Sequence, residues 1–242
     1  MIIKKYIFQT IFILFLIISI ISIITSIYSY NFPKELVITL DDIEKNDTFA
    51  NKGNYQKIIQ NLQENYGNKD IIGHLKINGT DIDTPIVQTT NNTYYLKHNL
   101  SKSYSRLGTP FIDYRNTNSD KQINIYGHNS ELIKMPFYDL SKYLNKDFYN
   151  NNQLIELVLN NKKNIYQIFS VYKENNNLDY YEHMKLEFND QEWLKHLNNL
   201  NNKSIYKNSI EFTRKDHIII LQTCLKNGNQ KKYLLICAKL IE

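Results

Sequence analysis

The chain has 242 residues, with 29 Lys and Arg against 24 Asp and Glu, which gives a formal net charge of +5. This length is typical of one ordinary domain with an additional segment, and a hydrophobic content of 42% excludes wholesale disorder. Only three of the basic residues are arginine, so the chain lacks the arginine-rich patches that nucleic-acid readers use. We therefore expect no nucleic-acid partner, and the scattered lysines indicate a solvated surface.

The two cysteines, Cys224 and Cys237, are too few for a disulfide scaffold or a four-cysteine zinc site. The sequence contains no HExxH motif, no CxxC motif and no glycine-rich phosphate loop, and its seven glycines leave little room for such a loop. We therefore expect neither a metal nor any other cofactor.

An uncharged apolar run occupies residues 6–28. Its length of about 23 residues is sufficient to cross a hydrocarbon core of roughly 30 Å as a helix. Lys4 and Lys5 precede it, and the positive-inside rule places that end in the cytoplasm. The pattern predicts a cytoplasmic N-terminus over residues 1–5, a single-pass transmembrane anchor over residues 6–28, and the remainder of the chain outside the cell.

A cleaved signal peptide is the alternative interpretation of the same run. Its apolar region is normally ~7–15 residues long and ends at a cleavage site of the Ala-x-Ala type. The two alanines of the chain, Ala50 and Ala238, lie far from the end of the run. The length and the missing site favour an uncleaved anchor.

Residues 29–69 read as a linker followed by a helix. The stretch Tyr55–Tyr66 places its apolar side chains on a single helical stripe, at positions Ile58, Ile59, Leu62 and Tyr66. This pattern predicts a helix that packs sideways onto a folded body, and a free amphipathic stalk is the alternative.

Residues 70–242 consist of short β-type runs separated by turn chemistry, including the hairpin signal Asn78-Gly79. Helical patterns intervene near residues 138–144 and 191–200, the latter after a cap signal at Asn189. We expect a mainly β fold, a closed or nearly closed barrel of about seven or eight strands with flanking α-helices. The predicted strands are residues 71–77, 82–88, 108–114, 122–128, 154–159, 165–172, 216–224 and 232–240.

Cys224 is the candidate nucleophile because it ends an apolar strand and precedes a basic loop, where a thiolate is stabilised and accessible. Cys237 lies in the middle of a strand and is expected to pack as a small apolar residue. In a hairpin of these two strands Cys237 lies opposite about Ile220, roughly 13 Å from Cys224. Because a disulfide tolerates at most about 7 Å between Cα atoms, the two cysteines should not bridge.

A nucleophilic cysteine needs a partner that manages protons, most often histidine. His128 ends an apolar run after Gly127 and thus mirrors the position of Cys224. His217 is more than about 20 Å from Cys224 along an extended strand, and His196 falls on a predicted surface helix. His128 is therefore the candidate general acid and base.

The motif IYGHNS, with LQTC about 95 residues downstream, a basic loop and a final strand that ends in AKL, resembles the sortase family. The segments FIDYRN at residues 111–116 and MPFYDLSKYL at residues 135–144 resemble class B sortases in particular. The resemblance spans the anchor, the N-terminal helix, the barrel and the helix before the cysteine strand. It implies that residues 70–242 are a sortase-like catalytic barrel on the cell-wall side of the membrane.

The resemblance implies a cysteine transpeptidase that acts on secreted proteins bearing a C-terminal sorting motif. Cys224 would attack the carbonyl of a threonine and form a thioester, which an amine of a cell-wall peptide or its lipid-linked precursor would resolve. His128 would protonate the leaving amine and deprotonate the incoming one. Asn92 and Leu96 match positions that line the sorting-motif groove.

The sequence departs from the family at the residues around the nucleophile. Sortases carry an arginine near the start of the last strand, but here Tyr233 occupies that position with Lys232 beside it. Strand alternation favours Tyr233 as the replacement donor, whereas charge favours Lys232. Gln222 stands where class B enzymes have serine, and with Thr223 it is expected to bind substrate. Two alternatives follow, a thiol hydrolase that releases its substrate to water, and a degenerate domain that binds wall or protein partners without turnover.

Overall fold

The computed structural model describes residues 10–23, 54–130, 134–175, 182–227 and 230–242. The chain divides into two compact units, Met1–Val37 and Ile38–Glu242. In the first unit residues 10–23 form an α-helix whose apolar side chains are exposed. None of the helices in the described ranges is both long enough and apolar enough to span a membrane. The other residues of the predicted anchor, 6–9 and 24–28, lie outside the described part of the chain.

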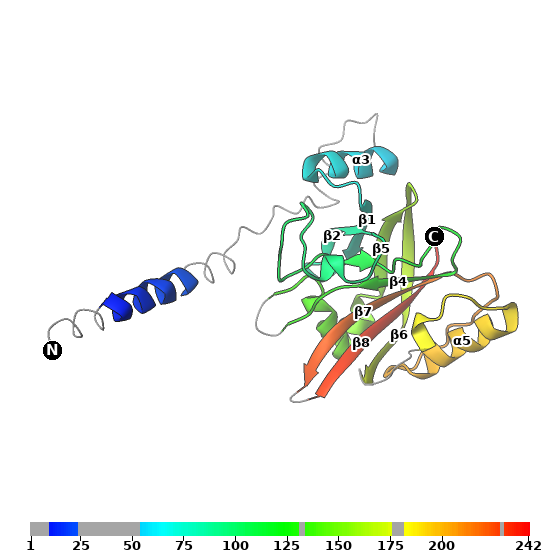
Figure 1. Cartoon of the computed structure of the whole chain (residues 1–242). Coiled ribbons are helices and arrows are strands. Elements are labelled where there is room, and N and C mark those ends of the chain that lie inside the picture. Colours follow the sequence, from blue (N-terminus) through cyan, green and yellow to red (C-terminus); the bar gives the residue numbers. More distant parts are fainter. Residues whose placement is uncertain (1–9, 24–53, 131–133, 176–181, 228–229) are drawn as a thin grey trace. The chain divides into compact units, whose positions relative to one another are not determined.

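Eight strands in the described part of the second unit close into a barrel in the order β1-β2-β3-β4-β7-β8-β6-β5 (Figure 1). The predicted closed β-barrel is therefore confirmed, and each of the eight apolar runs overlaps one strand. The strands are β1 (Ile71–Ile77), β2 (Asp83–Val87), β3 (Phe111–Ile112), β4 (Gln122–Tyr126), β5 (Leu154–Leu159), β6 (Lys162–Asn175), β7 (Ile218–Asn227) and β8 (Gln230–Leu240).

The strand pairing combines antiparallel neighbours with two parallel ones. The pairs β2–β3 and β4–β7 are parallel, and the other neighbours run antiparallel. Side chains alternate between the two faces of each strand, so Ile219 and Leu221 of β7 join the barrel interior while Ile218 and Ile220 join a second apolar cluster outside it. The polar residues later in β7 follow the same alternation. It determines whether each of their side chains faces the interior or the outside of the barrel.

Helix α3 (Tyr55–Tyr66) covers one end of the barrel sheet, as the sequence pattern predicts. Its residues Ile58, Ile59 and Leu62 are buried in a cluster with residues from β1, β2, β3 and β5. The side chain of Asn54 accepts a hydrogen bond from the amide of Lys57 and caps the start of the helix. The alternative of a free amphipathic stalk is therefore wrong.

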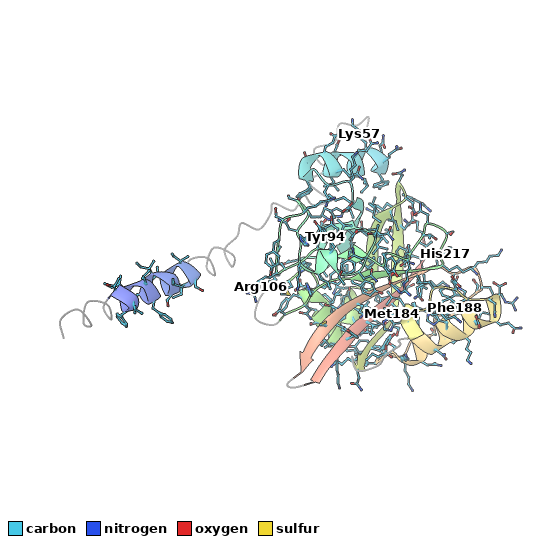
Figure 2. The ribbon with its side chains drawn as sticks, viewed as in Figure 1. Lys57, Tyr94, Arg106, Met184, Phe188 and His217 are labelled. Carbon is cyan, nitrogen blue, oxygen red and sulfur yellow. The ribbon has the colours of Figure 1, made fainter. Side chains whose placement is uncertain are left out.

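Helix α5 (Asp190–Asn202) begins with a capping box formed by Asn189 and Glu192. Its residues Trp193, Leu197 and Leu200 are buried against the outer face of β6, β7 and β8, and Figure 1 shows this helix beside those strands. The described part of the connection between β6 and α5 contains the 3₁₀ turn η3 (Glu182–Met184). Figure 2 labels Met184 and Phe188 of this connection.

The stretch predicted as a helix near residues 138–144 is the 3₁₀ helix η2 (Tyr138–Leu144), followed by the short α-helix α4 (Lys146–Asn151). A third 3₁₀ turn, η1 (Tyr94–Leu96), follows β2. The η2 turn buries Leu140 and Tyr143 in the barrel core, and Asn145 at its end caps α4 through its side chain. Burial of these side chains in the core thus stabilises η2. The turn ends after seven residues, directly before the residue that caps α4.

Candidate active site

The parallel pairing of β4 with β7 brings His128 and Cys224 to the same place on the barrel. Tyr126 pairs with Gln222 in this ladder, and the amide of Gly127 continues it by donating to the carbonyl oxygen of Gln222 at 3.2 Å. His128 and Cys224 each lie two residues beyond that pair. Neighbouring strands are about 4.8 Å apart, so two residues separated by 95 others along the chain become lateral neighbours.

A side-chain hydrogen bond ties the two strands together next to this pair. The hydroxyl of Thr223 is buried and donates to the carbonyl oxygen of Gly127 at 2.7 Å. The sequence predicts a substrate-binding role for Thr223, but its side chain points to the barrel strand beside it. Thr223, which precedes Cys224, is thus hydrogen-bonded to Gly127, which precedes His128.

The imidazole of His128 is oriented by a main-chain group. Its Nε2 lies 2.8 Å from the carbonyl oxygen of Leu96 at the end of η1. Because a carbonyl oxygen only accepts, Nε2 carries the proton, and Nδ1 is the nitrogen that remains for proton transfer. Gly108 packs beside the same ring, since a Cβ atom added there would lie 3.0 Å from its Cδ2.

The two cysteines differ in exposure, as expected. Cys224 is exposed, Cys237 is fully buried, and neither is in a disulfide. Cys237 pairs with Ile220 across the β7–β8 ladder, which confirms the predicted register. Burial raises the pKa of the Cys237 thiol well above its usual range. Only Cys224 is therefore available to a dissolved reagent or a substrate.

Tyr233 and Lys232 occupy different positions relative to the nucleophile. Tyr233 lies directly opposite Cys224 in the β7–β8 ladder, whereas Lys232 pairs with Leu225. Residues that pair across strands share a face of the sheet, so Tyr233 lies on the same face as Cys224 and Lys232 belongs to the other face. The position predicted to correspond to the family arginine is thus occupied by a phenol on the face of Cys224.

The two residues predicted to line the groove contribute in different ways. Leu96 is half-buried, and its main-chain oxygen binds His128. Asn92 uses its side-chain oxygen to accept a hydrogen bond from the amide of Tyr114 at 2.9 Å. Asn92 therefore joins two loops, at residues 92 and 114, next to the segment that orients His128.

The strand that carries Cys224 is longer than the sequence pattern indicates. The prediction ends it at Cys224, but β7 continues to Asn227 and β8 begins at Gln230. Residues Leu225–Asn227 pair with Gln230–Lys232 through the backbone, and polarity alone does not reveal such pairing. Cys224 consequently lies within a β-hairpin arm instead of at the mouth of a loop.

Hydrogen bonds through Asp113 and Arg115 hold the η3 turn against β4. Arg115 donates to both carboxylate oxygens of the buried Asp113 and also, at 3.1 Å, to the main-chain oxygen of Met184. Tyr126 donates its hydroxyl to Asp113 at 2.8 Å. Burial raises the pKa of Asp113, but these hydrogen bonds outweigh burial and hold it below its ordinary value. The ionised carboxylate thus fixes η3 against β4.

The burial and the hydrogen-bond partners of two histidines differ from what the sequence pattern suggests. His196 lies on α5, but its side chain is buried and its Nε2 is 2.7 Å from the side-chain oxygen of Gln122. His183, to which sequence reasoning assigned no role, is fully buried and lies between the side chains of Glu174 and Gln222. Their positions depend on contacts between segments far apart in the chain. In the described part of the chain, no group of three or more His, Cys, Asp and Glu residues could hold a metal ion.

Two known proteins that are similar to this chain in sequence are both named Sortase B. The chain is 38% identical over 177 residues to Sortase B of Listeria monocytogenes, covering 72% of this chain and 71% of the relative. It is 32% identical over 179 residues to Sortase B of Staphylococcus aureus, covering 72% of each chain. No family model matches the chain.

Solved structures agree with these relatives. The structure of Clostridium perfringens sortase B matches with a TM-score of 0.70 and 35% identity, covering 76% of this chain and 99% of that chain. A complex of Staphylococcus aureus sortase B with substrate matches with a TM-score of 0.66 and 29% identity, covering 84% of this chain and 98% of that chain.

Proposed function

The chain belongs to the sortase B family of cysteine transpeptidases, and from this premise we propose that it cleaves a C-terminal sorting motif of secreted proteins and transfers the acyl group to an amine of a cell-wall peptide. The register that makes His128 and Cys224 lateral neighbours carries the proposal. Among the similar solved structures are a sortase B in complex with substrate, a sortase B complexed with triglycine, and a mutant with serine in place of one cysteine.

The first half-reaction forms an acyl-enzyme. The thiolate of Cys224 attacks the carbonyl carbon of the threonine in the motif, and the negative charge moves to the carbonyl oxygen. The C–N bond then breaks as His128 delivers a proton to the leaving amine. Because Leu96 holds Nε2 of His128, Nδ1 is the nitrogen that carries this proton.

The second half-reaction releases the product. An amine of a cell-wall peptide attacks the thioester carbonyl, Nδ1 of His128 accepts the proton of that amine, and the C–S bond breaks to restore the thiolate of Cys224 beside the protonated His128. An amide bond is thereby exchanged for another amide bond, so no cofactor is needed. The tetrahedral states require hydrogen-bond donors at the oxygen, and the hydroxyl of Tyr233 is a side-chain donor on the face of Cys224.

The proposal places the enzyme at the cell envelope. Residues 6–28 form the membrane anchor, residues 1–5 lie in the cytoplasm, residues 29–69 link the anchor to the barrel, and residues 70–242 face the cell wall. The helix at residues 10–23, with its exposed apolar side chains, supports this organisation. The incoming amine then comes from a wall peptide or its lipid-linked precursor.

The test is product analysis with a library of threonine-containing peptides and the full-length protein. We expect a thioester on Cys224, an amide product when an amine is added, and no thioester in Cys224→Ala. Cys237→Ala should retain turnover, and His128→Ala should lose ~10²–10⁴-fold, as for a lost acid–base group. Hydrolysis alone, even with added amine, would identify a hydrolase. Absence of a thioester with every peptide would indicate a binding domain and contradict the proposal.

A further inference from the structure

The carbonyl oxygen that orients His128 belongs to a turn whose central residue is buried. The turn η1 begins at Tyr94, which Figure 2 labels, and ends at Leu96. The main-chain oxygen of Leu96 lies 2.8 Å from Nε2 of His128. Tyr95, directly before Leu96, is only 1% exposed. The contacts that fix Tyr95 therefore also restrict the oxygen that holds the imidazole.

The hydroxyl of Tyr95 is hydrogen-bonded both as an acceptor and as a donor. It accepts from Nδ2 of Asn68 at 2.8 Å and donates to Oδ2 of Asp70 at 2.8 Å. Burial raises the pKa of Tyr95 well above its usual range, so the hydroxyl keeps its proton and remains a donor. Lys102 pairs with the same oxygen of Asp70 at 3.0 Å and holds that carboxylate from a second side.

Asn68 is itself fixed by the end of the N-terminal helix. Gly67, in the left-handed conformation, ends α3, and Asn68 follows it directly. The side chain of Asn68 is fully buried, and its Nδ2 donates to the main-chain oxygen of Leu100 at 2.7 Å as well as to Tyr95. Its Oδ1 accepts from the amide of Asp70 at 2.9 Å. A buried amide that is hydrogen-bonded at both ends is held in one orientation, so it keeps the Tyr95 hydroxyl in one place.

The main chain of Tyr95 is held as well. Its carbonyl oxygen accepts a hydrogen bond from the amide of Thr109 at 2.9 Å. Gly108 lies so close that an added Cβ atom would be 2.6 Å from the oxygen of Tyr95 and 3.1 Å from the oxygen of Leu96. Tyr95 is thus fixed at its hydroxyl and at its peptide group, which leaves the next carbonyl little freedom to turn.

The hydroxyl supplies what the ring of Tyr95 alone does not. The ring is buried in one apolar cluster with Ile58, Ile59 and Leu62 of α3. Apolar burial is non-directional, whereas a hydrogen bond has a preferred distance and angle. Packing alone therefore allows the ring to shift slightly, and the two hydrogen bonds prevent it. Such shifts are costly near a proton-transfer group, since a displacement of about 1 Å can lower the rate ~100-fold.

We infer that Tyr95 is a positioning residue that acts through His128. Its hydroxyl, held between Asn68 and Asp70, fixes the turn η1. The carbonyl oxygen of Leu96 then keeps the proton on Nε2 and leaves Nδ1 available for proton transfer. The inference rests on the proposed function, since it concerns the proton-transfer step assigned to His128.

The first test is Tyr95→Phe in the full-length protein, which removes the hydroxyl and keeps the ring. With the library peptide that the parent uses best, kcat for acylation should fall about tenfold while KM stays within about twofold, because proton transfer is affected and binding is not. The matched control is Tyr143→Phe. Tyr143 is also fully buried, and its hydroxyl donates to the main-chain oxygen of Asn152 at 2.7 Å, but it lies in the barrel interior cluster. This control should keep kcat per folded molecule within about twofold.

Asp70 allows a second test that leaves the buried ring intact. Its side chain is 29% exposed, so its replacement is tolerated more readily than a change in the core. Asp70→Leu removes the acceptor of the Tyr95 hydroxyl and should lower kcat several-fold. Asp70→Asn keeps an oxygen acceptor and should restore most of that loss. Equal kcat in the two Asp70 variants would overturn the inference.

A variant without the imidazole separates positioning from general damage. If Tyr95 acts through His128, Tyr95→Phe should change the residual acylation rate of His128→Ala by less than about twofold. Losses that multiply in the double mutant would show that the hydroxyl acts on a different group, and they would contradict the inference.

NMR gives a readout that does not depend on turnover. In nitrogen-labelled Cys224→Ala protein, the Nε2 proton of His128 should exchange slowly with water because the oxygen of Leu96 binds it. Tyr95→Phe should speed this exchange at least about tenfold, the effect of one weakened hydrogen bond, and Tyr143→Phe should not. Unchanged exchange in Tyr95→Phe would refute the inference. If no peptide acylates the parent, the proposed function fails, and this exchange rate still decides the role of Tyr95.

Discussion

The hydroxyl of Thr223 donates a hydrogen bond of 2.7 Å to the carbonyl oxygen of Gly127, so the residues that precede Cys224 and His128 are joined directly. Thr223→Val keeps the shape of this buried side chain and removes the donor. We expect the free energy of unfolding to fall by about 1–2 kcal/mol and kcat/KM to fall several-fold, because the spacing of the two strands is no longer fixed. Thr223→Ser keeps the hydroxyl and should retain activity. Parent-level kcat/KM in Thr223→Val would show that the backbone ladder alone sets the spacing.

Gly108 allows a second test of how His128 is held. It has a φ of 65°, and a Cβ atom there would lie 2.6 Å from the main-chain oxygen of Tyr95 and 3.0 Å from the His128 ring. Gly108→Ala should therefore displace the ring and lower kcat about tenfold to a hundredfold. The matched control is Gly67→Ala, with a φ of 59° and no atom near the added Cβ. It should lose ~1 kcal/mol of stability and keep kcat. Equal kcat in the two variants would contradict the prediction.

Tyr233 lies opposite Cys224 in the β7–β8 ladder, at the position that the sequence is predicted to share with the family arginine. Tyr233→Arg should raise kcat/KM, since a planar cationic donor stabilises a developing oxyanion better than a phenol. Tyr233→Phe should lower kcat/KM, and Lys232→Ala, on the other face, should change it little. The measurement is kcat/KM for all three variants on one peptide. If every value stays within about twofold of the parent, neither side chain contacts the oxyanion.

Asp113 links β4 to the η3 turn through Arg115 and Tyr126. Its pKa in the folded state lies below the unfolded value of about 4. Its contribution to stability is therefore fully present above about pH 4 and is lost as the pH falls through the lower folded-state pKa. Asp113→Asn should lower the free energy of unfolding by about 1–3 kcal/mol at neutral pH, with a smaller difference from the parent near pH 2. Urea unfolding at both pH values measures this, and Asp147→Asn, an exposed change on α4, should stay within ~0.5 kcal/mol throughout.

The strands could be predicted from the sequence because barrel residues such as Ile219 and Leu221 bury apolar side chains in short runs bounded by turns. Cys224 and His128 are the sequence candidates because each follows such a run and because the motifs around them resemble a known family, and the β4–β7 register makes them lateral neighbours. The length of β7 could not be predicted, since its last residues pair through the backbone. The position of His183 depends on partners from β6 and β7, and no local pattern shows which partners a buried histidine will meet.

Strand β8 has a consequence for how the enzyme becomes active during synthesis. It follows every other strand in the sequence, but in the barrel it lies between β6 and β7. Chains emerge from their N-terminal end first, so the barrel stays open until β8 has emerged and inserted. Until then β7 lacks a neighbour on one side, and Cys224 lacks the strand that carries Tyr233. We therefore expect the nascent protein to be inert toward peptides during its synthesis, and its thiol to become a selective nucleophile only when folding is complete.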